Sequence, residues 1–148
     1  MGIFSALDIS ASGLTAQRVR MDTISQNIAN VNTTRTADGT PYRRREVVFE
    51  ERNDSKNSFS QALENASSKL NGGNGVRVSS IVEDSTEFKK VYDPGHPDAD
   101  ADGYVNMPNV DIVTEMVNMI SATRSYEANV TSVNATKSMA LKALEIGK

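Results

Sequence analysis

At the start of the chain, apolar residues recur every seven positions, and this spacing constrains the fold more than any other feature. One set of repeat positions holds Leu7, Leu14, Met21 and Ile28, and a second set, offset by three residues, includes Ile3, Ile24 and Val31. Such spacing is typical of a helix that lies along another helix. We therefore predict a helix from about Ser5 or Asp8 to about Ala29. Its partner comes from later in the sequence or from another molecule.

A second long helix is expected at the other end, from about Asp111 to Ile146. Its apolar stripe alternates by four and three residues, through Ile112, Met116, Met119, Thr123, Tyr126, Val130, Val133, Lys137, Ala140 and Leu144. Asn109 or Asp111 can cap this helix, and Glu115 lies near the positive end of its dipole. The simplest architecture is an antiparallel coiled-coil pair of terminal helices.

Between the helices we expect a small β and loop insert, so the fold class is mainly α with a small β insert. β-branched and aromatic residues predict strands over 42–49, 76–82 and 87–92, forming one small antiparallel unit. Residues 52–71 predict either a short amphipathic helix or a partly mobile insertion. The expected domains are a helical core from residues 1–34 and 109–148, and an insert from residues 35–108.

Composition excludes several functional classes. Hydrophobic residues make up 38% of the chain and aromatic residues 5%, so part of the burial is expected to come from other chains. A net charge of −3 gives no general case for binding nucleic acid or anionic membrane. The chain has no cysteine, and no apolar run long enough to span or insert into a membrane. Its start lacks the features of a cleavable signal peptide.

The sharpest chemical motif is a run of alternating carboxylates. Asp98, Asp100, Asp102 and Gly103 match the opening of a calcium loop, but Asn109 stands where a bidentate glutamate is needed. We favour a solvated turn, with a calcium-binding interaction module as an alternative. His96 is the only histidine and is interpreted as structural. No arrangement of residues indicates an enzyme, a metal site or a cofactor.

Three local features have more than one interpretation. Arg43, Arg44 and Arg45 form either a phosphate patch, or a solvated edge or set of salt-bridge donors, and we favour the second alternative. The polar string 27–34 is either the frayed end of the first helix or a hydrogen-bonded contact region, and periodicity does not decide between them. Gly13 permits close approach of a second helix, provides a flexing point, or is simply tolerated in the helix.

Both ends of the chain resemble bacterial flagellar rod and hook proteins. The opening signature runs from Ser12-Gly13-Leu14 to Asn27-Ile28-Ala29-Asn30 and Thr33, and the closing signature contains Tyr126-Glu127-Ala128-Asn129. The segment 91–110 is similar to that of proximal rod subunits. Its motif residues are Asp93, Pro94, Gly95, His96, Pro97, Asp98, Asp100, Asp102, Gly103 and Tyr104.

The resemblance implies a structural subunit of the proximal rod of the flagellar basal body, required for motility. Such subunits pass through the flagellar type III export apparatus without a cleaved signal. Their terminal helices assemble into a tubular drive shaft that spans the periplasm, encloses the export channel and transmits torque. The implied partners are other copies of the chain, other rod proteins and the adaptor protein at the membrane ring.

We expect the apolar positions of both helices to mediate helix packing and subunit assembly. These positions are Leu7, Leu14, Met21, Ile24, Ile28, Val31, Ile112, Met116, Met119, Tyr126, Val130, Val133 and Leu144. The alternative function is a cytoplasmic coiled-coil adaptor or export chaperone, which would share the helices but lack the segment 93–104.

Overall fold

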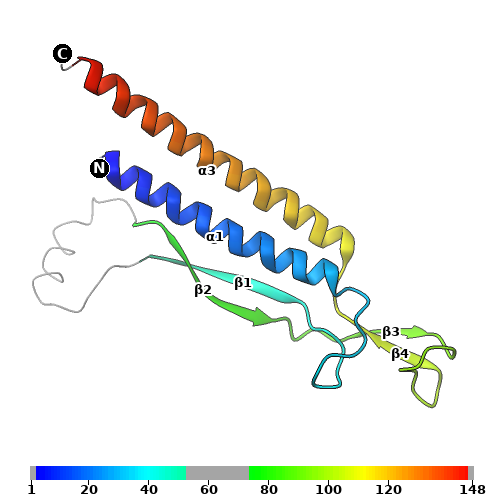
Figure 1. Cartoon of the computed structure of the whole chain (residues 1–148). Coiled ribbons are helices and arrows are strands. Elements are labelled where there is room, and N and C mark those ends of the chain that lie inside the picture. Colours follow the sequence, from blue (N-terminus) through cyan, green and yellow to red (C-terminus); the bar gives the residue numbers. More distant parts are fainter. Residues whose placement is uncertain (1–2, 53–73, 147–148) are drawn as a thin grey trace, which may run out of the picture.

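The computed structural model describes residues 3–52 and 74–146, and it has two long helices with four short strands between them (Figure 1). In chain order the elements are α1 (Ile3–Ala29), β1 (Arg45–Glu51), β2 (Val76–Glu83), β3 (Lys89–Tyr92), β4 (Tyr104–Met107) and α3 (Ile112–Ile146). This confirms a mainly α fold with a small β insert. The helix or insertion predicted over 52–71 falls almost wholly on residues 53–73, which lie outside the described residues.

The two helices lie side by side and antiparallel, as predicted. Both chain ends lie at the same end of the helix pair (Figure 1). The hydroxyls of Ser10 and Ser132 are 3.1 Å apart, and farther along α1 the Thr123 hydroxyl lies 3.7 Å from the sulfur of Met21. Residue numbers therefore rise along α1 as they fall along α3. At about 1.5 Å per residue, α3 is roughly 50 Å long.

Small and polar side chains lie at several contacts between the two helices. Ser10 meets Ser132, Gly13 faces Asn129, and Ala122 is 0% exposed. Ala16, Thr23 and Thr136 are also buried. Small residues let two helix backbones approach closely.

The predicted packing positions differ in exposure within one chain, and their role in helix packing and subunit assembly stays a prediction. Ile24 is buried, whereas Ile112, Met116 and Leu144 are 45%, 53% and 71% exposed. The remaining predicted positions are half-buried: Leu7, Leu14, Met21, Ile28, Val31, Met119, Tyr126, Val130 and Val133.

Gly13 lies at a point of close helix approach. A β-carbon built on Gly13 would come within 2.9 Å of the Asn129 side-chain nitrogen, which itself donates a 3.0 Å hydrogen bond to the carbonyl of Ser125. The glycine therefore accommodates the facing helix, which favours close approach over a flexing point or simple tolerance.

The β insert differs from the single unit that we predicted. β1 pairs with β2, and β3 pairs with β4, in two separate antiparallel ribbons. β4 begins at Tyr104, directly after the acidic motif, where we predicted no strand. Gly103, at a φ of 78°, turns the chain so that Tyr104 pairs with Tyr92, and the two rings meet edge to face with centroids 5.3 Å apart. The turn and the aromatic pair account for the unexpected strand.

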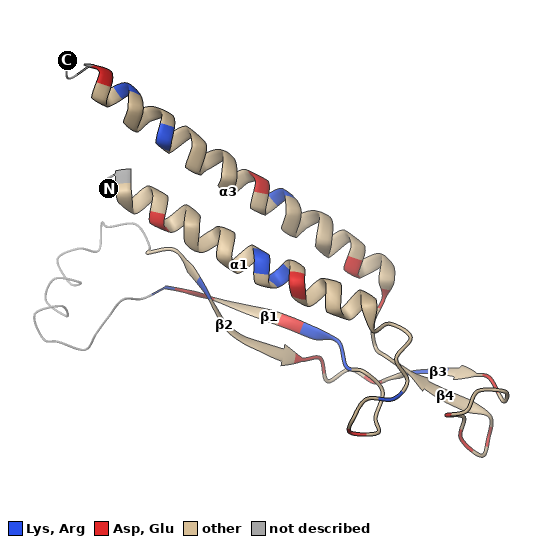
Figure 2. Ribbon diagram, viewed as in Figure 1, with Lys and Arg blue, Asp and Glu red and all other residues tan. Residues whose placement is uncertain are grey.

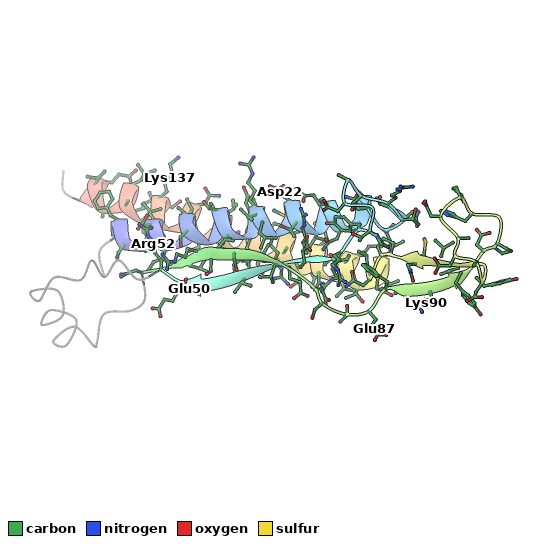
Figure 3. The ribbon with its side chains drawn as sticks, turned by 90° about the horizontal axis from the view of Figure 1, so that it is seen from below. Asp22, Glu50, Arg52, Glu87, Lys90 and Lys137 are labelled. Atoms are coloured by element: carbon green, nitrogen blue, oxygen red, sulfur yellow. The ribbon has the colours of Figure 1, made fainter. Side chains whose placement is uncertain are left out.

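The β1–β2 ribbon lies along α1, whereas the β3–β4 ribbon extends beyond the end of the helix pair (Figure 1). The backbone nitrogen of Val76 donates a 3.1 Å hydrogen bond to the hydroxyl of Ser12. Arg52 forms a 3.3 Å ion pair with Asp8. In Figure 3, Asp22 and Lys137 point away from this ribbon, so the two helices keep a face that the insert leaves uncovered.

The close contact at Gly13 predicts a coupling between two substitutions. In an Asn129→Ala background, Gly13→Ala should stabilise the protein by about 1 kcal/mol, because alanine favours a helix over glycine. In the parent chain the clash with Asn129 should remove that gain. Urea unfolding followed by circular dichroism measures both effects. An equal gain in both backgrounds would contradict the close approach.

Candidate assembly site at the helix–insert junction

A fully buried asparagine joins the last two turns of α1 to the insert and to α3. The Asn27 amide nitrogen donates 2.9 Å hydrogen bonds to the Arg45 carbonyl and to Glu115 Oε2. Its Oδ1 accepts from the Tyr42 hydroxyl at 3.0 Å and from the Arg45 backbone nitrogen at 2.9 Å. All the hydrogen-bonding capacity of the side chain is used, and Asn27 is 0% exposed. One side chain therefore fixes three chain segments.

Glu115 is a buried carboxylate in the first turn of α3, where it is 0% exposed. One oxygen accepts from Asn27 and the other accepts from Arg44 Nε at 2.8 Å. A buried charge is tolerated only when it is paired and hydrogen-bonded. The positive end of the α3 dipole stabilises the same charge.

Arg44 links this carboxylate to the insert. Its guanidinium donates to Glu115 and to Glu46, and it lies 3.4 Å from Asp84 Oδ2. Desolvation would lower the pKa of Arg44, but the hydrogen bonds to Glu115 and Glu46 outweigh it and raise the pKa above its ordinary value. Arg44 therefore remains a cation that bridges α3, β1 and the segment after β2.

The neighbouring arginines are also engaged within the chain. Arg45 forms a 3.4 Å ion pair with Glu83. Arg43 stacks over the Phe88 ring at 4.5 Å and donates a 3.2 Å hydrogen bond to the carbonyl of Asp84. These contacts, with those of Arg44, support the salt-bridge interpretation over a phosphate patch.

The polar string 27–34 is a hydrogen-bonded contact region. The Thr33 carbonyl accepts a 3.1 Å hydrogen bond from the Tyr42 nitrogen, and the Thr33 hydroxyl donates to Asn30 Oδ1 at 3.1 Å. The Thr34 hydroxyl donates to Asp98 Oδ2 at 2.8 Å. These bonds tie the end of α1 to both parts of the insert. Its interpretation as a frayed end is wrong.

The acidic motif forms a closed turn between β3 and β4. Asp98 binds Thr34, and its backbone nitrogen donates to Nδ1 of His96 at 3.1 Å. The backbone nitrogens of Asp100 and Gly103 donate within the turn to Tyr104 and Asp100. Among the described residues, no three acidic, histidine or cysteine side chains gather in a way that could hold a metal ion. The hydrogen bond at His96 gives that residue the structural role we expected.

Asp111 and Asn109, the alternative helix caps, have separate roles. Asp111 caps α3, since its Oδ1 accepts a 2.9 Å hydrogen bond from the Thr114 nitrogen. That bond lowers the pKa of Asp111 below its ordinary value. Asn109 instead accepts from the Arg44 nitrogen at 2.8 Å and donates to the Thr86 hydroxyl at 2.8 Å. Asn109 thus joins the junction from the segment that precedes α3.

Sequence reasoning did not place Tyr42, Arg44 or Glu115 in a common site. Burial raises the pKa of Tyr42, so its hydroxyl stays protonated as a donor to Asn27. A tyrosine and three arginines at the start of a strand resemble many solvated strand ends. The sequence signal that could have revealed the site is Glu115, a charged residue in the first turn of a helix whose neighbouring residues are mostly apolar.

Two family models match the ends of the chain, and several relatives match its whole length. Residues 7–35 match a model described as flagella basal body rod protein, and residues 101–146 match one described as flagellar basal body rod FlgEFG protein C-terminal. The flagellar basal-body rod protein FlgC of Bacillus subtilis is 54% identical, with 100% of both chains covered. The chain belongs to the FlgC family. The FlgC proteins of Borreliella burgdorferi and Salmonella typhimurium are 50% and 43% identical, covering 99% and 100% of this chain and 98% and 100% of their own.

The matched segments contain both helical sides of the junction in this FlgC-family chain. Asn27 lies in the first segment, and Asn109 and Glu115 lie in the second. Arg44 and Tyr42 lie between them. Neither described helix is long and apolar enough to cross a membrane.

Asn27→Ala should lower the free energy of unfolding by roughly 2–4 kcal/mol, because it leaves buried partners such as Glu115 and Tyr42 unsatisfied. Asn30→Ala is the matched control. Its side chain bonds only to nearby residues, since the amide donates to the carbonyl of Gln26 and the oxygen accepts from the Thr33 hydroxyl, so we expect a loss below about 1 kcal/mol. Urea unfolding of both variants provides the comparison. Equal losses would show that the junction is not specially stabilising.

The cap at Asp111 predicts a pH dependence. The folded-state pKa is lowered, so the stabilisation is present above the unfolded pKa of 3.8 and is lost as pH falls through the folded pKa. Asp111→Asn keeps a capping side chain but cannot ionise. The melting temperature of wild type should therefore be higher than that of the variant at about pH 7. This difference should shrink or reverse at about pH 2. A constant difference would exclude the charged cap.

Proposed function

We propose that this chain is a structural subunit of the flagellar proximal rod that assembles through its terminal helices into a tubular drive shaft. The full-length relationship to flagellar basal-body rod proteins named FlgC carries this proposal. The antiparallel helix pair supplies an elongated shape suited to side-by-side assembly. The shaft encloses the export channel and transmits torque, and the subunit is required for motility.

The proposal divides the chain into two assembly regions. It assigns residues 1–34 and 109–148 to the helical core and residues 35–108 to an insert that faces outward from the tube. The hydrogen bonds of Asn27 and Asn109 lie at the boundary between these regions. They hold the insert in a fixed position on the helix pair.

Apolar residues on the outer face of α3 support assembly with neighbouring chains. Residues with 45–71% exposure gather over its first three turns: Ile112, Val113, Met116, Val117 and Ile120. Exposed apolar patches commonly mark protein contacts. The half-buried positions of the predicted stripe, from Leu7 to Val31 and from Met119 to Val133, lie along the same two helices. Leu144 provides a further exposed apolar side chain at the end of α3.

The proposed setting is the rod within the basal body, where it spans the periplasm. The partners are other copies of the chain, other rod proteins, the adaptor protein at the membrane ring and the type III export apparatus. Export occurs without a cleaved signal peptide. The role is structural and not enzymatic, and no cofactor is needed.

Met116→Asp should reduce incorporation into purified basal bodies by about tenfold or more while the isolated chain keeps its melting temperature. The side chain is 53% exposed, so a charge disrupts assembly and not the monomer. Ser138→Asp, an exposed polar site on the same helix, is the control. Detergent extraction and quantitative immunoblotting give the readout.

Wild-type chain that stayed in the soluble cytosolic fraction would contradict the rod function and favour an adaptor or chaperone. Normal motility after removal of residues 1–30 would contradict assembly through the terminal helices.

A further inference from the structure

A groove of about 270 Å³ opens between α1 and β1 and reaches α3 at Asn118. Apolar side chains form part of its lining: Ile24 is buried, Val47 is half-buried and Phe49 is 36% exposed. The groove therefore combines surfaces of the helical core and of the insert. It offers apolar area to an occupant that brings apolar area of its own.

The groove holds one unbalanced positive charge. Arg20, Arg44 and Arg45 line it, with Glu46 as the one acidic lining residue. Figure 2 shows basic residues on α1 and at the start of β1, the two elements that border it. Glu46 and Glu115 neutralise Arg44, and Glu83 neutralises Arg45, so Arg20 is the lining arginine without an ion pair among the described residues. This unbalanced cation favours an acidic group on a partner.

Two polar side chains in this groove keep unused hydrogen-bonding groups. Arg44 and Arg45 are paired with Glu115 and Glu83. By contrast, the side chains of Arg20 and Asn118 have no hydrogen bond or ion pair with any part of the chain that the structure describes. Both are half-buried, so each has given up some water without gaining a protein partner. A guanidinium from α1 and an amide from α3 that line the same groove provide donors for a carboxylate.

We propose that this groove docks a segment of a neighbouring polypeptide that presents an apolar side chain next to an aspartate or glutamate. The carboxylate binds Arg20, with the Asn118 amide as a second donor. The apolar side chain packs on Ile24, Val47 and Phe49. A small free carboxylate would use the donors alone and leave the apolar lining uncovered, so a protein segment fits better. This inference rests on the proposed rod function, which supplies the neighbouring chains.

Charge reversal tests the contribution of Arg20. Arg20→Glu should reduce incorporation into basal bodies by about tenfold or more, since it places like charges at the contact. Arg18→Glu is the matched control, because Arg18 lies on the same helix, is exposed and does not line the groove. Its effect should stay within about twofold. The purified Arg20→Glu chain should keep its melting temperature, since Arg20 has no partner among the described residues. Incorporation equal to that of wild type would overturn the inference.

Chemical coupling tests the carboxylate directly. Arg20→Lys places an amine in the groove, and a carbodiimide joins an amine to an adjacent carboxylate as an amide with loss of water. In intact basal bodies we expect an adduct between residue 20 and an aspartate or glutamate of a neighbouring chain, and peptide mapping shows whether that chain is a second copy. Arg18→Lys should give no such adduct. No adduct at residue 20, or an adduct confined to Glu46 of the same chain, would overturn the inference.

The outcomes separate the groove from the rod function. If wild-type chain is absent from basal bodies, the rod function fails. If wild type and Arg20→Glu incorporate equally, the rod function stands and the groove inference alone fails.

Discussion

The buried hydrogen bond between Asn27 and Glu115 is the contact on which the rest of the structure depends. It joins the end of α1 to the beginning of α3, across 88 positions of sequence. Because both side chains are withdrawn from water, each needs every remaining partner that the insert supplies. Tyr42, Arg44 and the backbone of Arg45 are those partners. The helix pair therefore has its full set of buried hydrogen bonds only when the insert is also in place.

A buried hydrogen bond of this kind suits a helix pair with small residues at its contacts. Ser10, Gly13 and Ala122 offer few distinguishing side-chain contacts, so they discriminate weakly between neighbouring registers. A buried polar pair has a partner in only one register, and displacement leaves it unsatisfied. The hydrogen bond fixes the alignment, and the exposed apolar residues are left for other contacts.

Much of the architecture could be predicted from local patterns. The seven-residue spacing from Leu7 to Ile28 indicated a helix, and α1 ends at Ala29 as expected. The rotation of the helices could not be predicted, because an apolar spacing does not distinguish residues that face a partner helix from those that face another molecule. Met116 shows this: it continues the stripe yet is 53% exposed. β4 was missed because it depends on pairing with β3 beyond a turn made by Gly103.

The junction was still harder to foresee, because its members are far apart in sequence and each is ordinary alone. Asn27 belonged to a polar string with two open interpretations, and the arginine at position 44 was one of three in a row. Their role depends on which distant segments lie next to them in the folded chain. Sequence periodicity carries no information about such contacts.

The way the insert is attached has a mechanical consequence. Hydrogen bonds from Thr34 to Asp98, from Arg44 to Glu115 and from Asn109 to Thr86 join the insert to the ends of both helices. A twisting load on the insert would be shared among these bonds, because they act in parallel and not in series. No single one of them would have to carry the load, and the described parts of the insert, residues 35–52 and 74–108, would turn together with the helices.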